Sequence, residues 1–287
     1  MKNNKSRSGG QTKIYEMVTS RIIEELEQSQ IPWKQPWISG WPKNFITQKP
    51  YRGLNPLLLL CTDYSSPYWL TFNQAKKLKG GIRRGEKGCP VIFWKWIEVE
   101  NKEKSEEKKQ IPLLKYYTVF NIDQTENIQQ SSEIKPLENL EDPETVVKNM
   151  PKKPAITHRE ARAYYKPKPD VVNLPNRSLF SSIEDYYCTL FHELTHSTGH
   201  QTRLNRKEVI EKIQFNSEDY SKEELVAEIG ATFLCASSGI HPQIIENSTA
   251  YIQGWLKKLR DDKKFIVTAA AKAQKAADYI LGTAFLQ

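Results

Sequence analysis

Residues 181–199 read SSIEDYYCTLFHELTHSTG, and their apolar residues recur with the spacing of an amphipathic helix. Ser181, followed three residues later by Glu184, predicts a capping box in which both side chains accept hydrogen bonds from backbone amides. Gly199 predicts the left-handed residue that often ends a helix. The stretch therefore predicts one helix that begins after Ser181 and ends before Gly199.

This predicted helix contains the pattern H-E-x-x-H, with His192, Glu193 and His196 at its three fixed positions. One turn of helix places the two imidazoles on the same side, where two neutral imidazoles can hold one Zn²⁺. Glu193 lies beside them and can take a proton from water that the metal activates. The pattern favours a zinc metallopeptidase over the alternative, a surface helix whose histidines have no chemical role.

A zinc site of this kind needs a third protein ligand, and Glu224 and Glu228 are the candidates. They lie four residues apart on one face of a second predicted helix, which Ser221 would cap. One carboxylate can bind the metal while the other orients a bound imidazole. The pair resembles thermolysin-like zincins, and the resemblance implies that Glu224 is the ligand and Glu228 its supporting residue. The opposite assignment stays open, because Glu224 could serve only a capping box with Ser221.

The composition of the 287 residues allows two hydrophobic cores and indicates no membrane partner. No apolar run approaches the roughly 18 residues of a membrane span, and no apolar segment follows the basic N-terminus as in a secretory signal. The four cysteines lack C-x-x-C spacing, which argues against a disulfide framework or a zinc knuckle. We therefore expect a cytoplasmic protein.

Positive charge and tryptophan are concentrated in residues 1–125, with 21 lysines and arginines against 12 acidic residues and six of the seven tryptophans. Interleaved cations and rings are typical of surfaces for single-stranded nucleic acid, because cations neutralise phosphates while rings stack on unpaired bases. The alternative is that the tryptophans are core residues and the lysines an ordinary solvated face. For Trp94 and Trp96, which share one side of a predicted strand, we expect core positions. The candidate DNA-binding residues are Trp33, Lys34, Trp37, Lys43, Tyr51, Arg52, Lys76, Lys77, Arg83, Arg84 and Lys87.

Several motifs together resemble one protein family. YRGLNPLLLL at 51–60 and YWLTFNQAKKLKGGIRRGEKGCPVIFWK at 68–95 resemble the N-terminal domain of ArdC antirestriction proteins and related TraC-type primases. YYKPKPDVVNLP at 164–175, FHELTHSTGH at 191–200 and EELVAEIGATFL at 223–234 resemble the zincin-like metallopeptidase domain that accompanies it. The resemblance implies a protein of bacterial mobile DNA that protects incoming plasmid DNA from host restriction in the cytoplasm, to which it can be carried with the transferred DNA.

Together these observations predict an α+β protein of two domains. The first is an α+β domain for single-stranded DNA with strands at 91–99 and 116–122, and the second is a mainly helical, zincin-like metallopeptidase domain. The predicted segments are a disordered tail over residues 1–11, the DNA-binding domain over 12–125, a polar linker over 126–143 and the metallopeptidase domain over 144–287.

Two functions are compatible with this architecture. In the first, an enzyme recruited to single-stranded DNA uses Zn²⁺, held by His192, His196 and Glu224, to cleave a protein on or near the DNA, with Glu193 as general base. In the second, a non-catalytic protection factor or primase accessory binds single-stranded DNA and its metal site is structural or vestigial.

Overall fold

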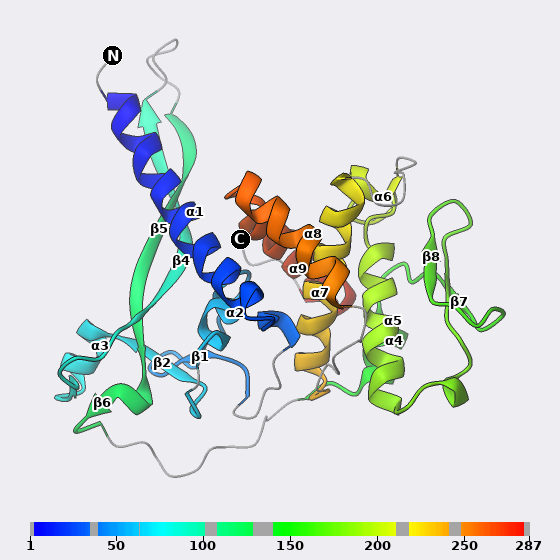
Figure 1. Ribbon diagram of the computed structural model, residues 1–287, viewed down its shortest axis with the longest axis horizontal. Coiled ribbons are helices and arrows are strands. Elements are labelled where there is room, and N and C mark those ends of the chain that lie inside the picture. Colours follow the sequence, from blue (N-terminus) through cyan, green and yellow to red (C-terminus); the bar gives the residue numbers. More distant parts are fainter. Residues whose placement is uncertain are drawn as a thin grey trace.

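The computed structural model of the protein describes residues 3–34, 40–62, 64–100, 108–128, 140–210, 218–240 and 248–283. Over these residues the chain is α+β, as predicted, with a sheet-based N-terminal part and a mainly helical C-terminal part (Figure 1). No helix within these segments is long and apolar enough to cross a membrane.

The N-terminal part combines a long helix with two sheets. Its elements are α1 (Asn3–Glu27), η1 (Pro32–Lys34), β1 (Lys43–Asn44), α2 (Asn55–Leu60), β2 (Tyr68–Thr71), α3 (Phe72–Lys77), β3 (Gly81–Ile82), β4 (Cys89–Glu100), β5 (Lys108–Asn121), η2 (Ile122–Gln124) and β6 (Thr125–Glu126). The larger sheet has the strand order β1-β2-β5-β4, and β3 pairs with β6. The long antiparallel strands β4 and β5 overlap the two predicted strands and are rich in β-branched and aromatic residues.

The C-terminal part packs helices beside a small sheet. Its elements are α4 (Pro143–Asn149), β7 (Ala155–Thr157), β8 (Tyr164–Lys166), β9 (Val171–Asn173), η3 (Arg177–Leu179), α5 (Ile183–Ser197), α6 (Lys207–Ile210), α7 (Glu218–Ser237), α8 (Ser248–Asp261) and α9 (Phe265–Ile280). The sheet has the order β7-β9-β8, and α7 packs against both α5 and α9. The long helix α7 therefore lies at the centre of this part (Figure 1).

Helix α1 joins the two parts of the molecule. Val18, Ile22 and Leu26 recur every four residues and are buried in one hydrophobic core that continues from the β4–β5 hairpin into α8 and α9. The Thr19 hydroxyl donates a hydrogen bond to the carbonyl of Lys263, 2.7 Å away, between those two helices. The two parts thus share their apolar interior.

The described residues differ from the predicted segment limits at three places, one of which is Pro143, the last residue of the predicted linker, where α4 begins. Helix α1 begins at Asn3, within the tail that the sequence predicted to be disordered, because an existing helix gains a backbone hydrogen bond with each added residue. Strand β6 carries ordered structure as far as Glu126, the first residue of the predicted linker. Residues 129–139 of that linker lie outside the described residues.

Candidate metal centre

Helix α5 places the H-E-x-x-H pattern on one face, as predicted, but its ends differ from the prediction. The N-cap is Ser182, whose hydroxyl accepts a hydrogen bond of 3.0 Å from the Asp185 amide, so the predicted cap at Ser181 is wrong by one residue. Two serines and two acidic residues in succession allow either register. Gly199 does not take the left-handed conformation. A Cβ there would lie 2.4 Å from Val209 Cγ2, so the glycine permits close packing.

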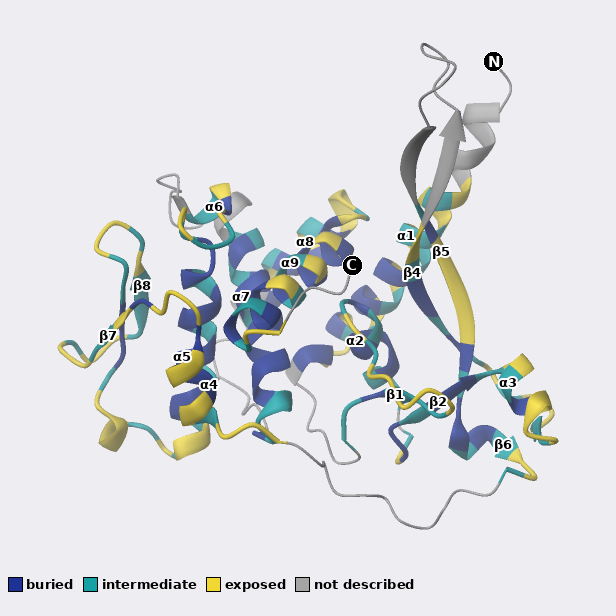
Figure 2. Cartoon of the chain, turned by 180° about the vertical axis from the view of Figure 1, so that it is seen from behind, coloured by how far each residue is buried: buried dark blue, intermediate teal, exposed yellow. Residues whose placement is uncertain are grey.

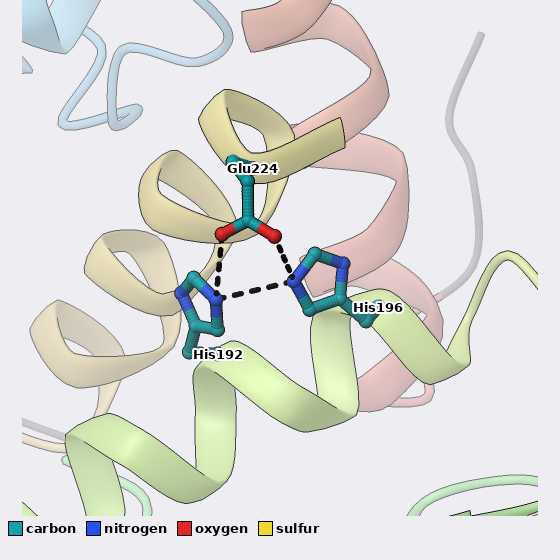
Figure 3. Close-up of side chains that lie close together, drawn as sticks. All are labelled: His192, His196 and Glu224. Carbon is teal, nitrogen blue, oxygen red and sulfur yellow. Dashed lines mark hydrogen bonds and ion pairs between the residues drawn. The ribbon is translucent and has the colours of Figure 1, made fainter. Parts of the chain in front are cut away.

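Three side chains from α5 and α7 meet in a compact cluster (Figure 3). The Nε2 atoms of His192 and His196 are 3.1 Å apart. His192 Nε2 lies 3.5 Å from Oε2 of Glu224, and His196 Nε2 lies 3.5 Å from Oε1, the other oxygen of that carboxylate. Three donors about 2.1 Å from one tetrahedral ion would be separated by about 3.4 Å. The spacing therefore fits a single Zn²⁺ or similar ion. Across the part of the chain that the structure describes, this is the only group of three His, Cys, Asp or Glu residues with such spacing.

The structure distinguishes the two candidate glutamates by position. Glu224 faces the Nε2 atoms of both histidines, whereas Glu228 Oε1 lies 3.9 Å from the opposite nitrogen of His192, Nδ1. Helix α7 begins at Glu218, so Ser221 lies within the helix and the predicted cap is wrong. The position of Glu224 between the two Nε2 atoms favours it as the ligand, and Glu228 lies on the side from which it could orient His192.

Sequence reasoning missed Glu223 and Arg206. Glu223 Oε1 lies 3.4 Å from Nδ1 of His196, so each histidine has a carboxylate on its far side. The guanidinium of Arg206 binds both oxygens of Glu223, and the pair is buried. Arg206 also donates to the Thr195 carbonyl and the Thr198 hydroxyl at the end of α5. The ion pair of Arg206 with Glu223 therefore holds α7 against the end of α5. In the sequence, the sign that could have indicated this pair is an arginine ten residues after His196.

The carboxylates make the cluster attractive to positive charge. Burial disfavours charged imidazoles, but Glu224, aided by the other glutamates, raises the pKa of His192 and raises that of His196 well above its usual value. Burial likewise opposes ionisation of Glu224, yet the two imidazoles lower its pKa. Glu193, itself buried and next to His192 in α5, adds to the rise in pKa at both histidines. The carboxylates thus favour added positive charge in the cluster, which either a proton on an imidazole or a bound divalent cation can supply.

The structure corrects the expected positions of two tryptophans. Trp33 was expected at a DNA-binding surface, but it is fully buried with its ring edge-on to Trp255 at 5.3 Å, because η1 turns it into the shared core. Trp94 was expected in the core, but it is 46% exposed on β4. Trp37 and the side chains of Lys34 and Trp96 lie outside the described residues.

The remaining candidate DNA-binding residues separate into two groups. Tyr51, Arg52 and Lys77 line one cavity of about 570 Å³ beside the larger sheet. Arg52 also binds Asp278 of α9 at 2.5 Å. The others lie around it on the N-terminal part: Lys43 over the Tyr68 ring, Lys76 exposed on α3, and Arg83, Arg84 and Lys87 exposed on the turn between β3 and β4.

Two family profiles match the chain in the two parts described above. Residues 12–120 match the N-terminal domain of the anti-restriction factor ArdC. Residues 143–272 match a zincin-like metallopeptidase family. The H-E-x-x-H helix and Glu224 both fall within the second match.

Two crystal structures of the antirestriction protein ArdC from plasmid R388 are similar to the whole chain. In each match, the sequence of ArdC is 40% identical to that of this chain. The metal-free structure has a TM-score of 0.76 and the Mn(II)-bound structure 0.78, and the matches cover 94% and 95% of this chain and 97% and 99% of ArdC.

Relatives known from sequence include DNA primases TraC of Escherichia coli and the uncharacterized protein y4eC of Sinorhizobium fredii. One TraC is 35% identical over 93% of this chain and another 33% over 93%, but these matches cover only 27% and 20% of the primases. Protein y4eC is 31% identical, and its match covers 94% of this chain and 92% of y4eC. The chain thus corresponds to a minor part of the primases and to nearly all of y4eC.

Proposed function

This chain belongs to the ArdC family of antirestriction proteins, and on that premise we propose that it binds single-stranded DNA and carries a zinc-dependent metallopeptidase site. It would act in the cytoplasm on incoming DNA, with a protein on or near that DNA as its substrate. One observation carries the catalytic part of the proposal, namely that one ligand atom from each of His192, His196 and Glu224 lies within 4.8 Å of the other two, with the buried Glu193 next to His192 in α5.

In peptide hydrolysis, the residues of this site would have three different roles. His192, His196 and Glu224 would hold the ion, which when bound would supply a Lewis acid and lower the pKa of water. Glu193 takes the proton from the attacking water and returns it to the leaving amine. Glu223 accepts from the Nδ1–H group of His196, and Glu228 lies 3.9 Å from Nδ1 of His192, where its charge favours a proton on that nitrogen. Both Nε2 atoms would then be free to bind the ion.

Metal analysis by mass spectrometry tests the ligand assignment. We expect one zinc per wild-type chain, none in Glu224→Ala, and affinity lowered about 10–100-fold in Glu228→Ala. Equal loss in both variants, or loss only in Glu228→Ala, would contradict the assignment. A competition between Zn²⁺ and Mn²⁺ decides the identity of the ion, because the similar ArdC structure holds Mn(II).

A second candidate function is a non-catalytic protection factor or primase accessory. The observation that favours it is the close agreement of the metal-free and Mn(II)-bound ArdC structures with this chain, which indicates a fold that does not require the ion. The Glu193→Gln variant separates the two candidates, since it keeps every metal ligand. Loss of antirestriction in Glu193→Gln supports the enzyme, whereas full protection of transferred DNA supports the second candidate.

A further inference from the structure

The cavity of about 570 Å³ on the N-terminal part, called the sheet cavity here, has a size typical of small-molecule sites. Its floor is formed by the buried Val91 and Val119 of β4 and β5. The start of α2 borders the cavity and is held to β4 by two hydrogen bonds. The Asn55 side-chain amide donates to the Ile92 carbonyl at 2.8 Å and accepts from the Ile92 amide at 2.7 Å. The sheet cavity is therefore preformed, far along the chain from the histidine helix.

One wall of the sheet cavity is a pair of stacked aromatic rings. Phe93 and Tyr117 are diagonal neighbours across β4 and β5, and their rings lie 4.4 Å apart and within 3° of parallel. Tyr117 is 56% exposed, in the exposed stretch of β5 that Figure 2 shows in yellow. An exposed ring held parallel to a second one presents a flat surface on which a further planar group can stack.

The opposite wall carries amides. The side chains of Asn44 and Gln74 exchange hydrogen bonds of 3.2 and 3.3 Å, and Gln74 also accepts from the Thr71 amide. Each NH₂ group has a second hydrogen. The two carbonyls are already occupied, that of Gln74 by Asn44 and Thr71 and that of Asn44 by Gln74 and the amides of the turn after it. Two N–H donors fixed side by side in this way can bond acceptors on the edge of a nucleobase.

The charge around the sheet cavity is positive. Lys77 lines it and has no acidic partner among the residues that the structure describes, whereas the charge of Arg52, which also lines it, is balanced by the ion pair with Asp278. None of the described lining residues is acidic. Lys115, which is directly opposite Phe93 and exposed, extends the positive charge along the same face of the hairpin. Cations at the rim of an aromatic slot are placed to contact phosphates on either side of an inserted base.

We propose that the sheet cavity holds one unpaired base of a DNA strand, stacked on the ring of Tyr117 with the neighbouring phosphates at Lys77 and Arg52. This site rests on the proposed binding of single-stranded DNA and specifies where on the N-terminal part the strand is held. The base edge faces the amides of Asn44 and Gln74.

Binding of labelled oligo-dT to the full-length protein tests the site. Removal of one stacking ring in Tyr117→Ala should weaken binding at least about tenfold, whereas Tyr117→Phe, which keeps the ring, should bind like the wild type. The matched control is Tyr116→Ala, because Tyr116 is 49% exposed and adjacent but lies on the opposite face of β5. Thermal melting of each variant confirms that it is folded.

A crosslinking measurement locates the base independently. An oligonucleotide with one 5-iododeoxyuridine should crosslink on irradiation to the peptide that contains Tyr117. Wild-type affinity in Tyr117→Ala, or a larger loss in Tyr116→Ala, overturns the sheet cavity as the site while strand binding itself stands. A wild-type protein that does not bind oligo-dT at all overturns the proposed DNA binding as well.

Discussion

The metal centre and the sheet cavity are built by opposite means. The three donors of the metal centre come from two helices, and each histidine is backed by a further carboxylate inside the protein. The sheet cavity is lined by residues from β1, α2, α3 and the β4–β5 hairpin, and its aromatic wall faces solvent. A site for a small ion needs rigid donors at short distances, whereas a site for a flexible strand needs an accessible flat surface.

This difference predicts where mutations cause damage. Changes at the metal centre should affect both the fold and the site, because its supporting residues also hold α5 to α7. Changes at the sheet cavity should affect binding alone, because Tyr117 and Lys77 are exposed. The following predictions test this division.

The largest effect is expected from Arg206→Ala. It leaves the carboxylate of Glu223 buried without its guanidinium partner, which should destabilise the protein by about 3–5 kcal/mol. The measurement is denaturant unfolding of the metal-free protein. The control is Arg83→Ala, which breaks an exposed pair with Glu86 on the N-terminal part and should cost about 0–1 kcal/mol. Similar losses in both variants would contradict the division between the two regions.

A smaller effect is expected from Gly230→Ala in α7. A Cβ there would lie 2.5 Å from Cγ2 of the buried Thr195, next to His196, so α7 must move away from α5. We expect a loss of about 1–3 kcal/mol in stability together with weaker metal binding. The matched control is Gly254→Ala in α8, where a Cβ meets nothing within 4 Å. That variant should gain up to about 1 kcal/mol, since alanine favours a helix.

The two regions also differ in how far sequence alone predicted them. The spacing of His192, His196 and Glu224 within helices is a local property, and the i, i+4 rule places such residues on one face without knowledge of the fold. The pairing of Glu223 with Arg206 depends on how α7 docks on the end of α5, and helix patterns do not contain that information. The predicted caps failed for two reasons: Ser181 and Ser182 are neighbours that offer two registers, and α7 begins at Glu218, before Ser221.

The positions of the tryptophans and the sheet cavity required tertiary structure. Trp33 and Trp94 both occur beside lysines in the sequence, yet one is buried and the other exposed, because burial depends on which elements cover each strand or turn. Likewise, the sequence marked Tyr51 and Lys77 as candidate DNA-binding residues, but it did not mark Tyr117, which lines the same cavity. Strand pairing between β4 and β5 brings it to Phe93.

Metal binding should depend on pH, and DNA binding should not over the same range. Burial opposes charge on His192 and His196, but Glu224 raises the pKa of both, so protons compete with the ion and affinity should fall as the pH is lowered through the raised pKa. A chelator competition between pH 8 and pH 6 measures this. Lysine and arginine as residue types stay protonated in this range, so oligo-dT affinity should change little.

The same shifts predict the stability of the metal-free protein. A group whose folded pKa is raised stabilises the fold fully below its unfolded pKa, about 6.5 for histidine, and this contribution is lost as the pH rises through the folded value. Melting temperatures of the metal-free protein should therefore fall as the pH is raised above about 6.5. Added zinc should reverse the trend, because it binds the neutral imidazoles. A metal-free melting temperature that rises over this interval would contradict the raised pKa of His196.

The smallest effect is expected from Lys77→Ala, and it sharpens the comparison from the side of the sheet cavity. Lys77 is exposed in the last turn of α3, so its removal should leave stability and metal content unchanged. Loss of one phosphate contact should weaken oligo-dT binding modestly and reduce the slope of log affinity against log salt by about 0.7. Tyr117→Ala should instead lower affinity with the slope unchanged, because a ring releases no counterions. Titrations at several salt concentrations separate the two residues.

Two outcomes would contradict this assignment. An unchanged slope in Lys77→Ala would place the phosphates elsewhere on the N-terminal part. A changed slope in Tyr117→Ala would mean that loss of the ring also displaces the strand from its cations.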